Sequence, residues 1–301
     1  MKKFSIITFL LLIFVTAANA QNDGAASTGL AFLKLGAGAR SLAMGEAYSS
    51  VTNDATAFIY NPARLIIGDK GNVSLMHNFS AQDVSMDYIS AKFPSGKKLA
   101  FGIGVFTTSV NDIEVRNTPG AAIEKFDARN LSTGLSLGYL VSANLSIGIT
   151  GKLIYEKIYI DDASGFGFDF GTNYSKDNYS LSFVVANIGS VSALKNVSTK
   201  LPSLVRFGGS YKFNASKTLS ILAAAEGFQV LSGGSFHLHS GAEAAYKDFL
   251  FLRLGYQSGY ENRGITTGVG FRYQAWSVDY AFIPYTDDFG TGNAISLGIN
   301  F

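Results

Sequence analysis

The chain has 301 residues, of which 47% are hydrophobic and only 15% are charged. Charged residues usually make up about a quarter of a globular domain, so this composition argues against a large soluble helical protein. The absence of cysteine excludes disulfides, thiolate metal sites, a cysteine nucleophile and a lipidated N-terminal cysteine. Without Lys2 and Lys3 the formal charge of +2 falls to zero, which disfavours a nucleic-acid-binding protein with a basic footprint.

The first twenty residues have the three parts of a secretory signal peptide. Lys2 and Lys3 precede an apolar stretch at 4–15, and small residues follow at Ala18 and Ala20. The apolar stretch is shorter than the roughly twenty residues that a membrane-spanning helix needs. We therefore expect cleavage after Ala20 and export of residues 21–301.

From residue 72 onward, large apolar residues alternate with small or polar ones. In the segment 144–155, for example, Ile147 and Ile149 alternate with Ser146 and Gly148. Such a period of two is typical of strands with one apolar face. Fourteen strands are predicted, at residues 72–79, 85–93, 98–108, 126–141, 144–157, 164–174, 178–187, 203–213, 217–227, 236–246, 249–258, 264–273, 275–283 and 293–301.

The predicted connections alternate in length. Those after even-numbered strands are short, whereas the longest, at 109–125, 188–202 and 284–292, follow odd-numbered strands. An even strand number with short turns on one side and long loops on the other is typical of bacterial outer-membrane barrels. The expected fold is therefore an all-β, 14-stranded antiparallel transmembrane β-barrel over 72–301, and the alternative is a secreted soluble β-protein.

The residues opposite the apolar face indicate which face meets lipid. Fourteen strands enclose too wide a lumen for large apolar side chains to fill, so the apolar face is expected to point outward. Leu137, Ile147, Phe168 and Leu254 should then contact lipid. Scattered charges should line the lumen, namely Lys152, Glu156, Asp169, Arg206, Lys212, Glu226, Glu243, Arg253, Arg272 and Asp279. Aromatic residues flank each short turn, which predicts an aromatic girdle at the periplasmic interface.

Residues 21–71 lack the alternation and are rich in Gly and Ala. Asp54 is expected to cap a short helix through Tyr60, and Pro62 to end it, because a proline disfavours helical geometry at Asn61. The apolar residues of the segment argue against a disordered tail. We expect a short helical hatch that plugs the lumen.

The same segment resembles a known family. Residues 32–45 (Phe-Leu-Lys-Leu-Gly-Ala-Gly-Ala-Arg-Ser-Leu-Ala-Met-Gly), Ala-Tyr at 47–48, Asn-Asp-Ala at 53–55 and Tyr-Asn-Pro-Ala-Arg-Leu at 60–65 resemble the N-terminal signature of the PorV/PorQ family. That family is similar to the FadL-type fatty-acid transporters, which are fourteen-stranded barrels with an N-terminal hatch. Arg64 and Glu46 stand where members usually have glycine. The resemblance implies a protein of the type IX secretion machinery in the outer membrane of Bacteroidetes-like bacteria.

Candidates for chemistry are weak. His237 and His239 share one strand face with Glu243, but two histidines at strand spacing without a third strong ligand do not make a metal site. No spacing selects a serine as the nucleophile of a barrel hydrolase. We expect no catalytic residue, no metal, no cofactor and no nucleic-acid partner.

Three functions remain. The first, which the resemblance favours, is a cargo-binding or carrier barrel of type IX secretion that contacts secretion components and cargo C-terminal domains. The second is a FadL-like transporter of hydrophobic small molecules. The third, a passive porin, is disfavoured by balanced lumenal charge and by a plug. A hatch or ligand path is predicted at Gly36, Gly38, Arg40, Met44, Gly45, Phe58, Asn61, Pro62 and Ala63. Partner-binding loops are predicted to present Asp112, Glu114, Arg116, Lys195, Lys200, Asp287 and Asp288.

Overall fold

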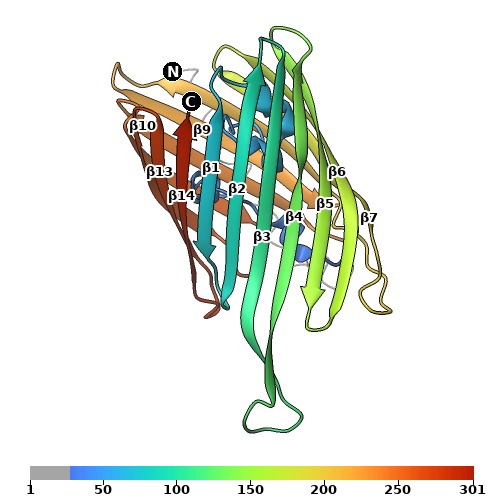
Figure 1. Cartoon of the computed structure of the whole chain (residues 1–301). Helices are drawn as coiled ribbons and strands as arrows, with labels where there is room; N and C mark the ends of the chain where they lie inside the picture. Colours follow the sequence, from blue (N-terminus) through green and yellow to red (C-terminus); the bar gives the residue numbers. More distant parts are fainter. Residues whose placement is uncertain (1–27) are drawn as a thin grey trace.

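The computed structural model of the protein describes residues 28–301, so the predicted signal peptide lies outside the described residues. Fourteen antiparallel strands close into one barrel, in which β1 pairs with β14 (Figure 1). The strands are β1 (Asn72–Phe79), β2 (Val84–Ser95), β3 (Leu99–Val115), β4 (Glu124–Leu140), β5 (Leu145–Ile158), β6 (Asp161–Lys176), β7 (Tyr179–Val191), β8 (Leu204–Asn214), β9 (Leu219–Val230), β10 (Phe236–Tyr246), β11 (Leu250–Ser258), β12 (Ile265–Tyr273), β13 (Trp276–Pro284) and β14 (Thr291–Asn300). The predicted fold is confirmed.

The predicted bounds fail most clearly at the connection 109–125. Most of it forms strand, because β3 continues to Val115 and β4 begins at Glu124. The pairing register shifts between Val110 and Ile113, and Asp112 has a positive φ of 58°. This bulge breaks the period of two, so alternation alone ends the strand too early.

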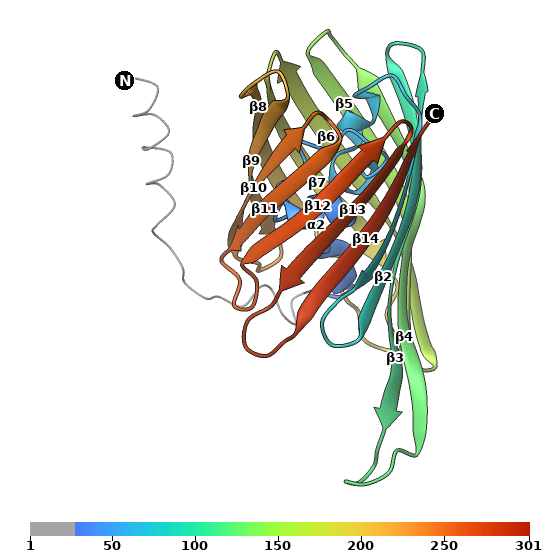
Figure 2. The ribbon, with the colours of Figure 1, turned by 90° about the vertical axis from the view of Figure 1, so that its left-hand side faces the viewer.

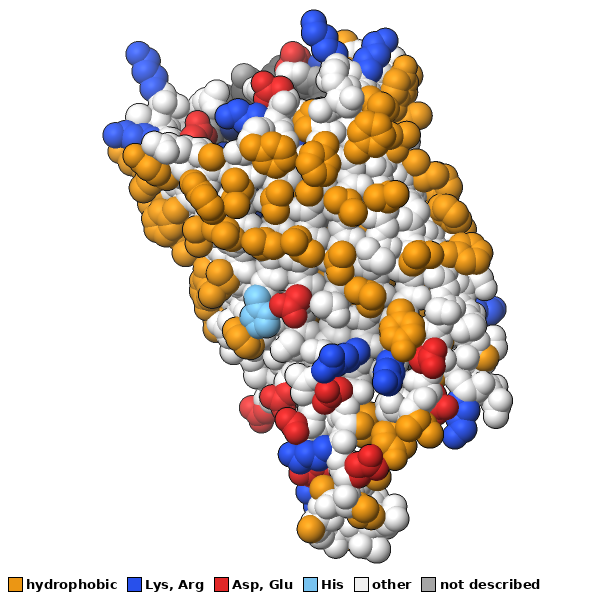
Figure 3. Space-filling model, in the orientation of Figure 1, with side chains coloured by type: hydrophobic (Ala, Val, Ile, Leu, Met, Phe, Trp, Pro, Cys, Tyr) orange, Lys and Arg blue, Asp and Glu red, His pale blue; other side chains and the backbone are white. Residues whose placement is uncertain are grey.

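The outer surface carries the apolar side chains, as predicted. Leu137, Ile147, Phe168 and Leu254 are all exposed on the outside of the barrel. Figure 3 shows apolar side chains in a broad belt nearer the short turns, with charged side chains gathered toward the long loops. The aromatic residues beside the short turns are exposed as well: Phe93, Tyr139, Tyr174, Tyr179, Phe213, Tyr246, Phe249, Tyr273 and Trp276. By the usual orientation of such barrels, the short turns face the periplasm.

The described part of the hatch, residues 28–71, lies inside the barrel (Figures 1 and 2). It contains η2 (Ala31–Lys34), α2 (Ala39–Ala43), α3 (Ala57–Tyr60) and η3 (Pro62–Ile66). It starts at the long-loop end, where the Gly29 amide donates to the Lys200 carbonyl, and it reaches β1 at the short-turn end. No helix in the described residues is long and apolar enough to cross a membrane.

The helix around residue 57 is shorter than predicted. Asp54 does not cap a helix directly; its Oδ1 accepts the Thr56 amide, and α3 begins only at Ala57. The end of α3 agrees with the prediction, because Asn61 is extended (φ −165°, ψ 103°) before Pro62. Pro62 itself opens η3, and the Asn61 side chain caps that helix by accepting the Ala63 amide.

The hatch backbone runs directly against small residues of the wall. A Cβ at Gly148 would overlap the backbone of Pro62 and Ala63, and one at Gly255 would overlap the backbone around Gly45. Gly45 has a positive φ of 62°, and its amide donates to Thr266 Oγ1 at 3.1 Å. The small inward residues are therefore the surface on which the hatch is seated.

Candidate functional site

The first connection between the hatch and the barrel wall is a series of linked salt bridges. Arg40 on α2 donates from Nε and Nη2 to the two carboxylate oxygens of Glu243 on β10, both at 2.7 Å. Glu243 also accepts from Arg253 Nε at 2.7 Å, and Arg253 Nη1 lies 2.7 Å from Asp279 Oδ1. Burial alone lowers the pKa of Arg40, but the Glu243 carboxylate outweighs it, so that the pKa stands well above its usual value. The hatch is thus held by a bidentate, fully charged pair.

A second ionic cluster lies further along the lumen. Arg206 Nη1 on β8 donates to Glu226 Oε1 on β9 at 2.8 Å, and Glu226 Oε2 accepts the Ser49 amide of the hatch at 2.7 Å. Glu46 of the hatch lies 4.0 Å from Arg206 and 3.8 Å from Arg263, measured between carboxylate oxygen and guanidinium nitrogen. Glu46, Arg206 and Glu226 are buried, so each of these three charges depends on its partners for compensation.

At the short-turn end, cations hold the hatch without carboxylates. Arg64 donates from Nε to the Thr52 carbonyl at 2.6 Å and from Nη1 to Asn173 Oδ1 at 2.8 Å. Burial lowers the pKa of Arg64 to about 10, so its guanidinium stays charged at neutral pH. Lys92 of β2 reaches into the lumen and donates to the Asn53 and Ile67 carbonyls at 2.9 and 2.6 Å.

The predicted hatch residues come together inside the lumen. Asn61 is fully buried and donates to the Ser49 carbonyl of the hatch and to the Thr172 carbonyl of β6. Met44 packs with Tyr48 and Tyr60, while Phe58 lies against Gly104. Of the predicted hatch residues, Arg40 is half-buried, and the buried ones are Gly36, Gly38, Met44, Gly45, Phe58, Asn61, Pro62 and Ala63. The geometry assigns them packing and anchoring, and their part in a ligand path stays a prediction.

Two glycines of the hatch permit close approaches. A Cβ at Gly36 would overlap the Tyr60 hydroxyl and the Glu46 carboxylate. Gly38 has a positive φ of 95° and precedes α2. Both glycines let the hatch fold tightly before Arg40 turns toward the wall.

All predicted partner-binding residues lie at the long-loop end, but not all are in loops. Asp112 and Glu114 belong to β3, which corrects their predicted loop position. Arg116, just beyond β3, forms a salt bridge with Glu114. Lys195 and Lys200 lie between β7 and β8, and Asp287 and Asp288 lie between β13 and β14. Lys200 contacts the start of the hatch, because its carbonyl accepts the Gly29 amide.

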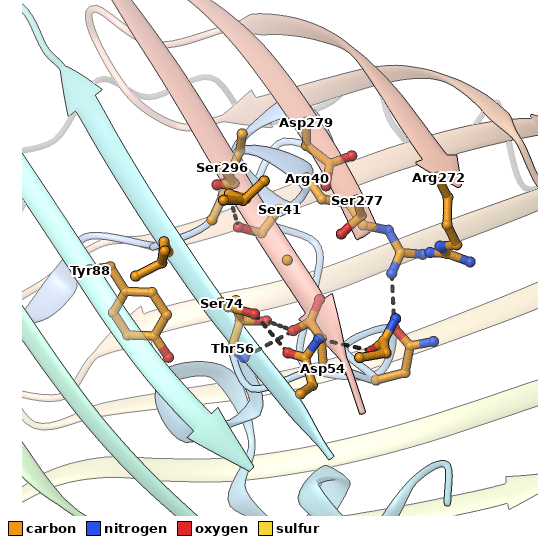
Figure 4. Close-up of a pocket in the computed structure, with 18 of the residues that line it drawn as sticks. Arg40, Ser41, Asp54, Thr56, Ser74, Tyr88, Arg272, Ser277, Asp279 and Ser296 are labelled. Atoms are coloured by element: carbon orange, nitrogen blue, oxygen red, sulfur yellow. Dashed lines mark hydrogen bonds between the residues drawn. The ribbon is translucent and has the colours of Figure 1, made fainter. Parts of the chain in front are cut away.

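Cavities in the described part of the lumen differ between its two ends. Toward the long loops they are small, about 30 Å³ beside Phe58 and Phe106 and about 20 Å³ beside Leu42 and Met86. Toward the short turns they are larger and polar, about 150 Å³ beside Arg40 and Arg272 and about 260 Å³ beside Arg64 and Lys212. Figure 4 shows the 150 Å³ cavity, with Tyr88 and Arg272 at opposite ends.

Several anchoring residues escaped the sequence analysis. Lys92 occupies an inward position of the alternating strand β2, so the alternation of the sequence could have indicated that its side chain enters the lumen. Glu46 is in the left-handed region (φ 60°) at a position where glycine is usual in the family that the segment resembles. Asn187 had no signal, because a register shift in β7 brings it into the lumen, where it binds Lys152 Nζ at 2.6 Å and the Leu33 carbonyl at 3.2 Å.

The histidine pair has structural contacts. The ring of His237 stacks on Tyr260 with 3.8 Å between centroids, and His239 Nε2 lies 2.9 Å from the Tyr260 hydroxyl. Within residues 28–301, no group of three or more His, Asp or Glu side chains is arranged to hold a metal ion.

Two solved structures that share this architecture are a toluene transporter and a monoaromatic hydrocarbon channel. The toluene transporter TodX of P. putida matches with a TM-score of 0.62 at 15% identity, covering 88% of this chain and 99% of that one. The monoaromatic hydrocarbon channel CymD matches with a TM-score of 0.63 at 12% identity, covering 91% and 97%. At such identities the likeness shows the fold alone. None of the curated proteins compared matches this sequence.

The family model that matches describes the type IX secretion system membrane protein PorP/SprF, over residues 47–300. The expected link to type IX secretion is thereby confirmed, whereas the narrower PorV/PorQ assignment is wrong, because PorP/SprF is a different family. The PorV/PorQ-like motif falls mainly in the hatch, and its first part, residues 32–45, lies outside the match. The chain belongs to the PorP/SprF family of type IX secretion system membrane proteins.

Proposed function

We propose that this outer-membrane barrel is a closed docking protein of type IX secretion, which binds cargo or a secretion component at its long-loop end. The observation that carries the proposal is a two-stranded ribbon, formed by residues 111–115 of β3 and 124–127 of β4. The last β2 partner on β3 is Val110, and the first β5 partner on β4 is Ala128. Beyond that pair the ribbon has two free edges and stands clear of the barrel (Figures 1 and 2).

The ribbon has two unlike faces. Phe126 continues the lumenal positions of β4, since it has the parity of the buried Ser132, and it opposes Ile113. Its ring also packs against Tyr159 with 5.3 Å between centroids. The other face carries Glu114 opposite Lys125. The face of Ile113 and Phe126 ends at the pair of Val115 and Glu124, so it is apolar with one acidic residue at its tip. Such a face and a charged opposite face suit a protein partner, because interfaces combine an apolar centre with a polar rim.

The free edges indicate what kind of partner fits. An exposed strand edge offers unpaired amide and carbonyl groups to an extended segment of another chain. Three ion pairs lie along this part of β3 and β4: Asp112–Lys125 joins the two strands, whereas Glu114–Arg116 and Asp127–Arg129 each run along one side. They neutralise the charged face within the ribbon, so the apolar face and the edges are left to provide the binding energy. A β-rich domain, such as the C-terminal domain of a cargo protein, matches this surface.

The test shortens β3 and β4 to the level at which β2 and β5 end, which removes the ribbon. Replacing residues 111–127 by an Asn-Gly turn joins Val110 to Ala128, a cross-strand pair that β2 and β5 still flank. We expect normal barrel levels and heat-modifiable migration, with loss of cargo from the cell surface. The matched control substitutes Asp287 and Asp288 by Asn, in the loop between β13 and β14, and should secrete normally. Normal secretion without the ribbon would contradict the proposal.

A FadL-like transporter of hydrophobic small molecules is the second candidate. The apolar lining of the cavity beside Phe58 and Leu35 favours it. That cavity holds about 30 Å³, however, whereas sites for small organic ligands usually span roughly 300–1,000 Å³. Transport would therefore require the hatch to leave its buried ion pairs. Uptake of a labelled fatty acid by wild-type cells, lost in Phe58→Ala, would support this candidate.

A further inference from the structure

The short-turn end of the lumen, opposite the ribbon, carries an open polar recess. Its larger part, about 260 Å³, reaches the turn residues Asp177 and Asp248. It shares Arg40, Asn53 and Arg272 with the 150 Å³ cavity of Figure 4. The recess therefore faces the periplasm and lies between hatch and wall.

Most carboxylates deep in this recess are already engaged. Glu243 binds Arg40 and Arg253, and Asp279 binds Arg253. Asp54 accepts the Thr56 amide of the hatch. Glu243 and Asp279 are therefore already paired with arginines, and Asp54 Oδ1 is engaged by the hatch.

Three other cations line the recess without such a partner. Arg64 is buried and donates only to uncharged oxygens, among them the Thr52 carbonyl and the Asn173 amide. The guanidinium of Arg272 lies 4.8 Å from the ring centroid of Phe251, and it makes no salt bridge with a described residue. The same holds for the Lys212 ammonium, at the recess wall formed by β8. Arg64 is buried, Arg272 is half-buried and Lys212 is exposed. Cations with no carboxylate in contact favour an anionic ligand.

The rim has the opposite character. Asp177 and Asp248 belong to turns between strands, and Ser180, Ser210 and Ser220 line the recess as well. Rim carboxylates repel a small free anion, but they accept hydrogen bonds from peptide amides. Lipid headgroups lie outside the wall, whereas this recess is inside it.

We propose that this recess, the periplasmic recess, binds an acidic peptide segment of a periplasmic protein. Side-chain carboxylates of the segment bind the buried Arg64, the half-buried Arg272 and the exposed Lys212, while its backbone amides donate to the rim carboxylates. The recess is at the opposite end of the barrel from the ribbon. Peptide binding in the recess can therefore be tested independently of cargo docking at the ribbon.

The test uses the whole mature protein in lipid nanodiscs. A fluorescent peptide of alternating aspartate and glycine is titrated, beside its asparagine counterpart and inorganic phosphate. Arg272→Gln and Lys212→Gln change wall residues that do not hold the hatch. Lys97→Gln, in the exposed turn between β2 and β3, removes a charge at the same end without lining the recess. Heat-modifiable migration verifies the fold of each variant.

We expect the acidic peptide to bind, more weakly as salt rises, and the asparagine peptide to bind at least about ten-fold more weakly. Arg272→Gln and Lys212→Gln should each weaken binding about ten-fold, and Lys97→Gln and the ribbon replacement should leave it unchanged. Equal binding of both peptides, or no effect of either recess variant, would overturn the proposal. So would binding of phosphate without the peptide, which would indicate a small-anion site.

Discussion

Glu243 is the residue on which the hatch depends most, because one buried carboxylate serves two arginines. Its two oxygens bind Arg40 of the hatch, and one of them also binds Arg253 of the wall. The partners are not equivalent, since Arg253 has Asp279 as a second carboxylate and Arg40 has none within hydrogen-bond distance. Removing the acid therefore harms the hatch more than removing the hatch arginine.

We expect Glu243→Gln to lower the free energy of unfolding by about 3–5 kcal/mol, because it leaves the buried Arg40 without a carboxylate. Arg40→Gln should cost less, since Glu243 keeps Arg253. Urea unfolding in liposomes, followed by heat-modifiable migration, measures both. An equal or reversed order would mean that the chain of ion pairs does not hold the hatch.

Leu254 tests which face of the barrel meets lipid. It is 56% exposed at the centre of β11. Leu254→Arg should cost roughly 2–4 kcal/mol near the membrane midplane, and the same change at Ser109, toward the long-loop end, about 0–1 kcal/mol. Unfolding free energies in liposomes provide the comparison. Equal costs at the two depths would refute the outward apolar face.

Among the secondary-structure elements, β5 holds the hatch in position through direct contact with the hatch backbone. Gly148→Ala would place a methyl group in the backbone of Pro62 and Ala63. We expect a displaced hatch and a measurable ion conductance in planar bilayers, where the wild type is closed. Gly151→Ala on the same strand is the control, because its Cβ would meet only Phe168 at an ordinary 3.5 Å. Closed channels in both variants would show that the hatch tolerates the shift.

The last strand ends in contact with the first. The Phe301 amide donates to the Gly71 carbonyl at 3.0 Å, and its ring lies 6.0 Å from that of Phe93. Deleting Phe301 should lower the amount of barrel in the outer membrane, because its amide and its ring fasten β14 to the segment that enters β1 and to β2. Quantitative blotting of outer-membrane fractions measures this, with Phe301→Tyr as the control. Unchanged levels after the deletion would contradict it.

Alternation predicts elements well and contacts between them poorly. The bounds of β1 and β10 agree with the sequence prediction, because both strands alternate without a bulge. The ribbon was missed where Asp112 interrupts the period. The sequence predicted that the hatch lies in the lumen but not which wall residues hold it. Bonds such as Arg40–Glu243 join residues far apart in the chain, and one sequence holds no information on such pairing. The alternation predicted which charged side chains of the wall point inward, but it did not predict the residues with which they pair.

For the whole molecule, the two candidate functions differ in whether the hatch must move. A docking protein can work with a closed lumen, whereas a transporter must open it. The chain contains no cysteine, so a single introduced disulfide can lock the hatch. Ser49 of the hatch and Ser182 of β7 have their hydroxyl oxygens 2.7 Å apart, which suits replacement of both by cysteine. The lock leaves the ribbon untouched.

The most direct measurement is cargo secretion by Ser49→Cys/Ser182→Cys cells, compared between oxidised and reduced states, with each single variant as control. A closed docking barrel predicts equal secretion in both states, because the hatch never has to move. Secretion that is lost on oxidation and restored by a reductant would show that the lumen must open, and would contradict the account.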